Sequence, residues 1–403
     1  MAGVNLNLAG DRLNYFQQGI LLNLQYWQGC LAENGEESGA LEQDYPGLLR
    51  AIAYGLDLAA AGWPLTFPLI EQLAPFMERR GYWEAWRELL QPALALAGRL
   101  GERAAEVNMA VLLARLSFRQ SRPADTVHYY RRAIRLARQT GDVYNLARAC
   151  TNLGYSYIEW GFLHRAEILC CYALDIFDQL DNDHGRAHTK NHLGVLYTQQ
   201  GRWALARQHL EQACQIWQSR HDEYGSMYGH MNLGVLFIYM EDAESALRHS
   251  EMALHYAEQV GEKLEAATIT MNLGIAYRLK EQWVEAQHFT RQAEQVFQDL
   301  SHNFGLALVL DNWALIYMQQ QDWEKAAWTL QAALKAWRDL DNKYGEIRVM
   351  TYYAEYELNR GQKSAAHRWL RQAEHLLREQ SRTKGYTLLF QRADEIRRNL
   401  TKN

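Results

Sequence analysis

Apolar residues along the chain recur at spacings of three and four, the period of amphipathic helices, and the whole pattern recurs every 40 residues. Asn-Leu-Gly occurs at 152–154, 232–234 and 272–274, and His192-Leu193-Gly194 keeps the same frame. An aromatic residue follows the Gly position by three residues, at Tyr157, Tyr197, Phe237, Tyr277 and Tyr317. Alanine follows it by 12 and 19 residues, as at Ala166 and Ala173. A fixed period through so many positions indicates a repeat protein.

Each 40-residue unit predicts two helices. The Leu-Gly pair and its aromatic residue lie on the buried face of the first helix. The two alanines share one face of the second, where a methyl group lets two helix backbones approach closely. Turn signals separate the helices, as at Gly161, Gly201 and Gly361, and others separate the units, as at 181–185 and 341–345. The sequence therefore predicts an all-α fold, a right-handed α-solenoid of about eight antiparallel helix hairpins.

The prolines divide the chain into a less regular beginning and a regular remainder. All six lie at or before Pro123, so helix breakers are confined to that part. We expect Pro75 and Pro92 to interrupt the first, degenerate unit. A solenoid also needs caps, because a terminal unit otherwise exposes its stacking face. We expect an N-terminal helical cap over 1–62, eight repeats over 63–380 and a capping helix over 381–403.

The repeat resembles the tetratricopeptide family, whose pattern is W-x2-L-G-x2-Y, then A-x3-F, then P. Leu153, Gly154, Tyr157, Ala166 and their copies match the Leu, Gly, Tyr and Ala positions. The leading Trp and the closing Pro are replaced, and the period is 40 rather than 34. These departures look like the long-repeat branch seen in kinesin light chains, spindle-orientation adaptors and the sensor arms of bacterial STAND ATPases. The resemblance implies a binding module for peptides, proteins or occasionally small molecules.

The resemblance also implies that the first helix of each unit lines a concave groove. The residue before Leu-Gly would point into this groove, with others four before and three after it, because residues four apart share a helix face. Applied to this sequence, that rule and its neighbouring positions give Arg115, Arg119, Arg148, Asn152, Tyr155, His188, His192, Tyr228, Asn232, Asn272, Asn312 and Arg348.

Two sets of groove residues suggest chemistry. An asparagine amide donates and accepts, so the row of asparagines is suited to gripping a peptide backbone. The alternative is that these amides satisfy neighbouring backbone or help the helices to stack. Arg115, Arg119 and Arg148 form a basic corner suited to a carboxylate or phosphate. The alternative for the corner is internal pairing with acidic residues such as Glu159.

His184, His188 and His192 are spaced four apart, and histidines at that spacing can share a metal ion. No Glu follows the first His at the required place, and no further ligand is evident. His184 is expected in the turn between units, outside the helix. We therefore expect no metal and no cofactor, and histidines that hydrogen bond with a partner instead.

Composition narrows the classes of function. The net charge of −5 disfavours nucleic acid as a partner. Five cysteines without a CxxC pair favour reduced thiols. No signal peptide and no membrane-spanning run is evident, so we expect a cytoplasmic protein. No GxxxxGK[ST], GxGxxG, HExxH or GxSxG motif is present, which argues against an enzyme.

The leading expectation is a non-catalytic scaffold that holds a partner protein or peptide in its groove. The partner would be an extended segment with apolar and acidic residues. The alternative is a ligand-sensing or oligomerising regulatory module that works with a separate ATPase or effector.

Overall fold

The computed structural model describes residues 4–34, 39–381 and 385–401, and within them every regular element is a helix. The expected all-α solenoid is confirmed. The helices are α1 (Val4–Asn34), α2 (Gly39–Asp57), the short 3-10 helix η1 (Ala59–Ala61), α3 (Trp63–Arg80), α4 (Trp83–Leu100), α5 (Arg103–Arg119), α6 (Pro123–Thr140), α7 (Val143–Glu159), α8 (Leu163–Gln179), α9 (Asp183–Gln199), α10 (Trp203–Ser219), α11 (Glu223–Tyr239), α12 (Ala243–Val260), α13 (Lys263–Leu279), α14 (Trp283–Asp299), α15 (Asn303–Gln319), α16 (Trp323–Asp339), α17 (Lys343–Asn359), α18 (Lys363–Ser381) and α19 (Thr387–Thr401).

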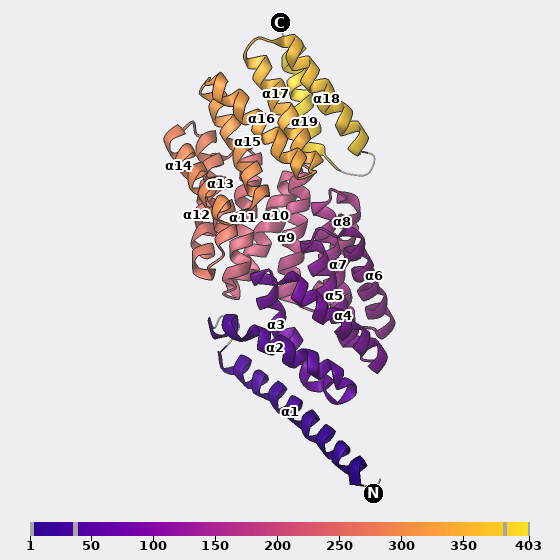
Figure 1. The fold of residues 1–403 in the computed structure, drawn as a ribbon. Coiled ribbons are helices and arrows are strands. Elements are labelled where there is room, and N and C mark those ends of the chain that lie inside the picture. The colour runs from indigo at the N-terminus through magenta and orange to yellow at the C-terminus, as the bar shows by residue number, and fades with distance from the viewer. Residues whose placement is uncertain (1–3, 35–38, 382–384, 402–403) are drawn as a thin grey trace. The chain divides into compact units, whose positions relative to one another are not determined.

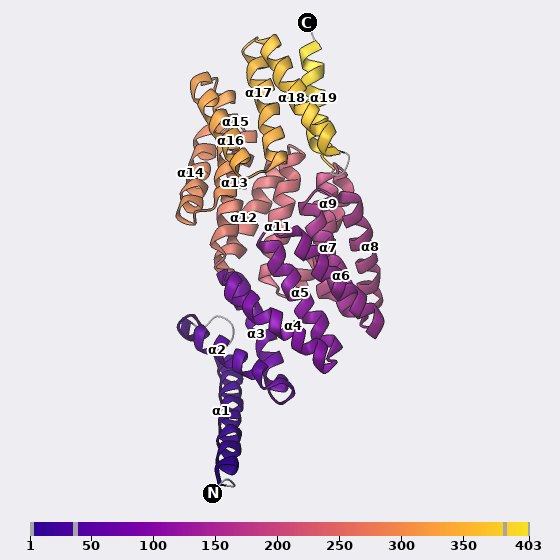
Figure 2. The ribbon, with the colours of Figure 1, turned by 45° about the vertical axis from the view of Figure 1, so that its right-hand side comes forward.

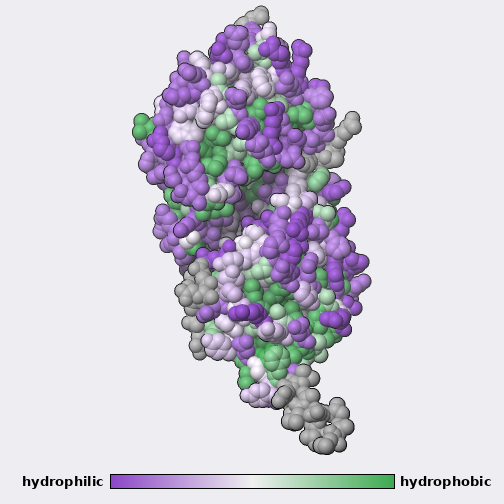
Figure 3. Space-filling view, viewed as in Figure 1, coloured by the Kyte–Doolittle hydropathy of each residue, from purple (hydrophilic) through white to green (hydrophobic). Residues whose placement is uncertain are grey.

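The chain forms two compact units, Met1–Leu153 and Gly154–Asn403, called here the N-terminal and C-terminal units. In each unit, helices that follow one another in sequence pack side by side (Figures 1 and 2). In the C-terminal unit this arrangement continues from α8 to α19. On the face shown in Figure 3, hydrophilic side chains predominate and hydrophobic ones form smaller groups. Within the described residues, no helix combines the length and the apolar character needed to cross a bilayer.

Turns between helices recur every 20 residues and share one backbone conformation. The turn residue has a positive φ at Gly81, Gly101, Gly141, Gly161, Gly201, Gly261 and Gly361, and also at Ser121, Asp181, His221, Glu241, Glu281, Ser301, Gln321 and Asp341. This left-handed conformation ends a helix and favours glycine. Several following helices are capped by a side chain, as where Asn182 Oδ1 accepts a hydrogen bond from the Gly185 amide at 2.7 Å.

Small residues allow the two helices of a repeat to approach closely. A Cβ added at Gly194 would lie 2.4 Å from Leu210 Cγ. The repeated alanines of the second helices are fully buried, including Ala166 and Ala173. The expected role of the small residues is therefore confirmed by their packing.

Large aromatic side chains pack where one repeat meets the next. The ring of Trp217 at the end of α10 covers Gly225 at the start of α11, and Phe177 covers Gly185 in the same way. A side chain at either glycine would collide with the ring, because the added Cβ would lie 2.3 Å from it. Each Gly thus makes room for the aromatic residue eight positions earlier.

Two expected boundaries are wrong. Helices α3 and α4 continue through Pro75 and Pro92. A proline inside a helix costs about 3 kcal/mol through a lost hydrogen bond and a clash. In α3, fully buried Leu73 and Met77 flank Pro75 and compensate for that cost. The other boundary concerns His184, which lies in the first turn of α9 rather than outside the helix.

The C-terminal capping helix begins later than expected, at Thr387, and residues 382–384 lie outside the described part of the chain. Before this helix, the Gly385 amide donates a hydrogen bond to the Gly161 carbonyl at 2.7 Å. The segment that closes the C-terminal unit therefore contacts the turn between α7 and α8.

The first helices line the inner side of the C-terminal unit. The first helices of the repeats are α9, α11, α13, α15 and α17. Each of them contacts the next one along the chain, and α17 contacts the capping helix α19. Successive second helices make few direct contacts with one another in the described residues. A stack of hairpins curves toward the helices that are closer together. We call the surface of α9, α11, α13, α15, α17 and α19 on that side, together with Tyr155 of α7, which stacks on His192 of α9, the inner face.

Candidate functional site

Three arginines on three helices converge on the inner face around Tyr352 of α17. They are Arg278 of α13, Arg348 of α17 and Arg392 of α19, and we call them the arginine cluster. The guanidinium of Arg392 lies 4.7 Å from the centre of the Tyr352 ring. Arg278 lies close enough to Tyr352 and Arg392 that both side chains affect the pKa of Arg278.

Arg348 is the most firmly held member of the cluster. One guanidinium nitrogen donates to Asp311 of α15 at 2.6 Å, and both side chains are largely buried. The Trp337 and Tyr344 rings lie 5.2 and 5.7 Å from the guanidinium carbon. Burial disfavours the charge of Arg348, but the Asp311 carboxylate, together with Tyr352, Tyr344 and Tyr239, outweighs this effect, so the pKa of Arg348 is raised. Its Nε atom is buried without a hydrogen-bond partner among the described residues.

Arg392 repeats this arrangement on α19. Its guanidinium donates to Glu355 of α17 at 2.5 Å. The Nε atom is again buried and has no hydrogen-bond partner in the part of the chain that the structure describes. Arg348 and Arg392 therefore each have one carboxylate partner and one unused buried donor.

Arg278 differs because its hydrogen-bond partners are neutral. Its Nε donates to Asn312 Oδ1 at 3.0 Å, and a second nitrogen donates to Gln319 Oε1 at 3.3 Å. Burial lowers the pKa of Arg278, and the charge of Arg392 lowers it further. The third member of the cluster is thus a crowded cation held by two amides.

Aromatic and histidine side chains occupy the inner face nearer the start of the C-terminal unit. The ring of His192 stacks on Tyr155 at 4.7 Å, and Tyr155 also hydrogen bonds with Glu159. His188 lies 5.3 Å from the Trp217 ring and 4.5 Å from the His184 ring. Burial, with a smaller contribution from His188, lowers the pKa of His192 to about 3. His192 is therefore neutral at pH 7, and its buried Nδ1 has no partner within the described residues.

The asparagines of the C-terminal unit are not equally accessible. Asn232 is half-buried and donates to Asn191 Oδ1 at 2.9 Å. Asn272 and Asn312 are only 4% and 2% exposed. Asn312 donates to Thr290 Oγ1 at 2.9 Å and accepts from Arg278, so its amide serves the internal packing. The amide nitrogen of Asn272 is buried and has no partner in the described structure.

Tyr228 lies in the same part of the inner face. Its hydroxyl donates to Glu265 Oε1 at 2.8 Å and lies 3.3 Å from the Tyr224 hydroxyl. Of the expected groove residues in this unit, Tyr155, His188, His192, Tyr228, Asn232 and Arg348 remain at least partly exposed.

The basic corner lies in the N-terminal unit and surrounds a buried acid. Arg115 donates to Glu78 at 2.5 Å, and Arg148 donates to Asn108 Oδ1 at 2.9 Å. Arg119 is close enough to Glu78 to help lower the pKa of that carboxyl, although burial dominates and raises it. Arg115 is therefore paired internally, as in the alternative interpretation of this corner, and its partner is Glu78. Asn152 of α7 is half-buried in the same unit.

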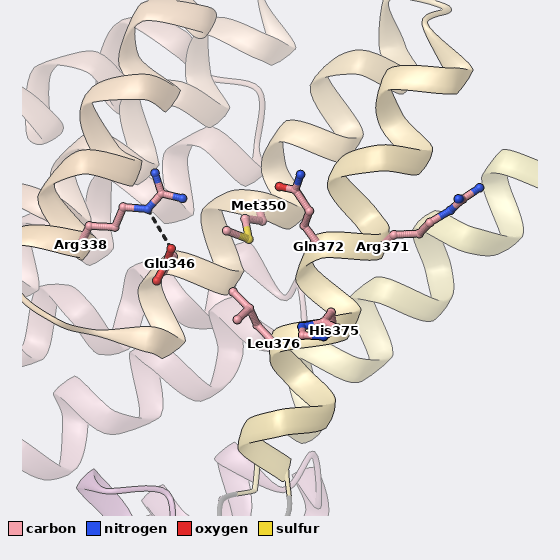
Figure 4. A pocket seen from close by; sticks show the side chains of 7 residues that line it. All are labelled: Arg338, Glu346, Met350, Arg371, Gln372, His375 and Leu376. Atoms are coloured by element: carbon pink, nitrogen blue, oxygen red, sulfur yellow. Dashed lines mark hydrogen bonds and ion pairs between the residues drawn. The ribbon is translucent and has the colours of Figure 1, made fainter.

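A shallow pocket of about 480 Å³ lies between α16, α17 and α18 (Figure 4). Arg338 donates to Glu346 at 2.8 Å on one side, and His375 and Arg371 of α18 lie on the other. Lys343 pairs with the same carboxylate at 2.9 Å, and the two cations hold the pKa of Glu346 low despite its burial. The carboxylate of this pocket is thus satisfied by two cations.

Sequence reasoning missed Arg278, Arg392 and Asp311. Arg278 lies six residues after Asn272, between the positions that the groove rule selects. Arg392 lies in the capping helix, which has no repeat frame to follow. Asp311 lies one residue before the asparagine row, a position that the rule assigns to the helix interior. A signal for Arg278 was present in the sequence: the equivalent position of the neighbouring repeats is apolar or threonine, as at Ile238 and Thr198.

His184, His188 and His192 all lie on α9, and the rings of His184 and His188 are 4.5 Å apart. Among the described residues, no group of three His, Cys, Asp or Glu side chains is arranged to hold a metal ion. The cysteines form no disulfide among the described residues, and Cys150, Cys170 and Cys214 are buried.

Comparison with known proteins identifies the repeat. Residues 145–219 match the tetratricopeptide repeat family model. The chain is a tetratricopeptide-like solenoid, as its sequence led us to expect. A sequence search of curated proteins finds no match.

Several solved structures share the fold. The apo form of the quorum sensor NprR from B. thuringiensis has a TM-score of 0.58 and 16% identity over 90% of this chain and 99% of that one. A Rap protein complexed with competence and sporulation factor has a TM-score of 0.57 and 12% identity over 88% and 99%. The Pyrococcus horikoshii STAND protein with a tetratricopeptide repeat sensor has a TM-score of 0.52 and 14% identity, and the match covers 87% of this chain and 54% of that one. At these identities the likeness concerns the fold.

Proposed function

We propose that the protein is a non-catalytic scaffold that holds an extended segment of a partner peptide or protein along the inner face of its C-terminal unit. One observation carries this proposal: side chains from α13, α15, α17 and α19 converge on one surface. The Arg392 guanidinium lies 4.7 Å from the Tyr352 ring, and Arg348 donates to Asp311 at 2.6 Å. Arg278 is close enough to Tyr352 for the phenol to affect the pKa of the guanidinium. A surface that receives one or two side chains from each repeat suits an elongated ligand.

The chemistry along this surface supports a peptide as the ligand. Asn232, His192 and the phenol of Tyr155 offer donors and acceptors for a peptide backbone. The partly buried side chains of Val235 and Ile275 lie between these groups and the arginine cluster in the repeat frame. This combination fits a segment with apolar side chains and a negative charge.

The structural neighbours agree with a binding role. One was solved with competence and sporulation factor bound, and another is described as a quorum sensor. Both descriptions agree with a tetratricopeptide-like scaffold that binds a peptide or protein. The fold itself does not determine the ligand.

A random peptide pool tests the proposal. Immobilised protein would be incubated with random nine-residue peptides, about 30 Å long when extended, and the retained peptides identified by mass spectrometry. We expect the wild-type protein to retain a reproducible subset. The double variant Tyr155→Ala/Asn232→Ala should bind these peptides at least about tenfold more weakly, a loss of about 1.4 kcal/mol.

The matched control is Arg207→Gln on α10. Arg207 is exposed and pairs with Glu211 of the same second helix at 2.7 Å, and its guanidinium lies 5.7 Å from the ring of the buried Phe237 rather than beside the inner-face residues named above. This variant should retain the same peptides as the wild type. The proposal is wrong if no peptide is retained, or if the double variant and the wild type retain the same peptides equally.

A ligand-sensing or oligomerising module remains the second candidate, supported by the likeness to the sensor-bearing STAND protein. Sedimentation of the protein with and without the retained peptides distinguishes the two roles. A change of oligomeric state on peptide binding favours the regulatory module, and an unchanged state favours the simple scaffold.

A further inference from the structure

We infer that Arg278 anchors a carboxylate of the bound segment, so that the inner face selects peptides that carry a monoanionic group near apolar residues. This inference rests on the proposed function. It concerns which ligands the inner face selects, rather than whether it binds peptides.

The first step is the pairing of Arg278. A buried cation is costly unless an anion compensates it. Among the described residues, no carboxylate lies within 4.0 Å of the Arg278 guanidinium, and its partners are the amides of Asn312 and Gln319. Burial, with a contribution from Arg392, lowers the pKa of Arg278 more than the more distant Tyr352, Glu355 and Glu241 raise it. An anionic ligand would remove this penalty.

The second step is the contrast with the other two arginines. Arg348 and Arg392 have their own carboxylates at 2.6 and 2.5 Å. Each nevertheless keeps a buried Nε donor without a partner in the described chain. Buried donors of this kind are normally hydrogen bonded in the functional state of a protein. The cluster thus contains one guanidinium, Arg278, without a carboxylate at contact distance, and two buried Nε donors, of Arg348 and Arg392, without a partner in the described chain.

The third step is the charge of the ligand. Asp311 and Glu355 pair with Arg348 and Arg392, while Glu241 and Glu395 act on Arg278 and Arg392 from farther away. Arg278 is therefore the member of the cluster that can pair with an incoming carboxylate, whereas these acids would repel the second charge of a phosphate dianion. The planar fork of a guanidinium also matches the two oxygens of a carboxylate. Tyr352 is buried beside the cluster, and the lower local dielectric of a buried site strengthens the attraction.

Three peptide pools test this inference on the full-length protein. One contains random nine-residue peptides without Asp or Glu but with a free C-terminal carboxylate. The second has amidated C termini and contains Asp and Glu. The third is amidated and lacks both acids. We expect the wild-type protein to retain the third pool at least about tenfold less than the better of the other two. Which of those two is preferred identifies the carboxylate as terminal or side-chain.

Two variants connect this preference to Arg278. Arg278→Gln removes the charge and should abolish the preference for carboxylates while some neutral peptides are still retained. Asn312→Asp is nearly isosteric and gives Arg278 an internal carboxylate, since Asn312 Oδ1 already lies 3.0 Å from Arg278 Nε. It should abolish the preference too, although it removes the hydrogen bond that the Asn312 amide donates to Thr290 Oγ1, so its folding is measured alongside. Arg207→Gln again serves as the control.

The outcomes separate the two proposals. If the wild type retains peptides from all three pools equally, or if both variants keep the preference for carboxylates, the inference is wrong and peptide binding stands. If no pool is retained, peptide binding is wrong and the inference falls with it. Thermal unfolding of each variant verifies that it is folded.

Discussion

At the scale of single residues, the His230–His249 pair makes stability depend on pH. The two Nδ1 atoms lie 3.0 Å apart, so both rings cannot be protonated without strong repulsion. Burial, and then His249, lowers the pKa of His230 to about 4. A histidine in the unfolded chain titrates near about 6.5. Between these values the unfolded chain binds a proton that the folded chain does not, so the free energy of unfolding falls as the pH decreases.

The expected loss from His230 approaches about 1.4 kcal/mol for each pH unit below about 6, until the pH reaches the folded pKa. Urea unfolding at pH 7 and pH 5 measures it. His230→Gln should reduce the difference between the two pH values, because glutamine does not titrate. An equal pH dependence in the variant and the wild type would show that this pair does not contribute.

A second prediction at this scale concerns Gly194. Gly194→Ala places a Cβ 2.4 Å from Leu210 Cγ and 3.3 Å from the Ala206 carbonyl oxygen. We expect a loss of about 1–3 kcal/mol in the free energy of unfolding, as for other overpacked sites. Gly98→Ala in α4 is the control, since its nearest neighbours are side-chain atoms at 3.8 Å. That change should be neutral or stabilising, because alanine favours the helix. Equal effects of the two changes would argue against close packing at Gly194.

The groove residues show what a repeat frame can predict and what it cannot. The frame places Asn232 and Asn312 on equivalent surfaces, yet Asn232 is half-buried and Asn312 is 2% exposed. The difference arises because Arg278 lies over the Asn312 amide. Arg278 comes from the preceding repeat, and no feature of one repeat alone reveals it. Local periodicity thus predicts the face of a residue, whereas contacts between repeats determine its accessibility.

At the scale of elements, the left-handed turn residues predict how turn substitutions alter stability. Glu281 adopts a φ of 59° and Gly261 a φ of 74° in equivalent turns. A non-glycine residue pays about 1 kcal/mol in this conformation. Glu281→Gly should therefore raise the free energy of unfolding by about that amount. Gly261→Ala should lower it similarly, because no atom lies within 4 Å to clash and only the backbone effect remains. Chemical denaturation measures both, and a stability loss in Glu281→Gly would contradict the argument.

Element boundaries were predictable wherever the turn chemistry repeats, as at Gly161 and Gly201. They were not predictable in the first unit, where Pro75 and Pro92 lie inside helices. A proline argues locally for a break. Burial of neighbours such as Leu73 and Met77 stabilises the continued helix, and this burial depends on tertiary packing that the local sequence does not reveal. The same reasoning explains why α1 and α2 could be expected only as a helical cap over 1–62, without bounds for the individual helices.

At the scale of the whole molecule, the capping helix connects distant parts of the C-terminal unit. Helix α19 buries Leu389, Ile396 and Leu400 and contacts α17 and α18. Just before it, Gly385 is bound to the Gly161 carbonyl. A Cβ at Gly385 would lie 2.7 Å from Leu163 Cδ1, so the approach depends on glycine. We expect this contact to hold the turn between α7 and α8 against the end of the solenoid.

Gly385→Val tests that closure without removing a helix. The larger side chain should displace the segment from Leu163, and the Gly161 carbonyl should lose its hydrogen bond. Hydrogen exchange measured by mass spectrometry should then become faster in peptides that contain 160–165 and 385–390, while exchange in α12 stays unchanged as an internal reference. Because Arg392 follows on the same helix and reaches Glu355 and Tyr352, the variant should also weaken the binding of carboxylate-bearing peptides. Unchanged exchange at both segments would mean that α19 is held by α17 and α18 alone, and that the contact with Gly161 does not close the unit.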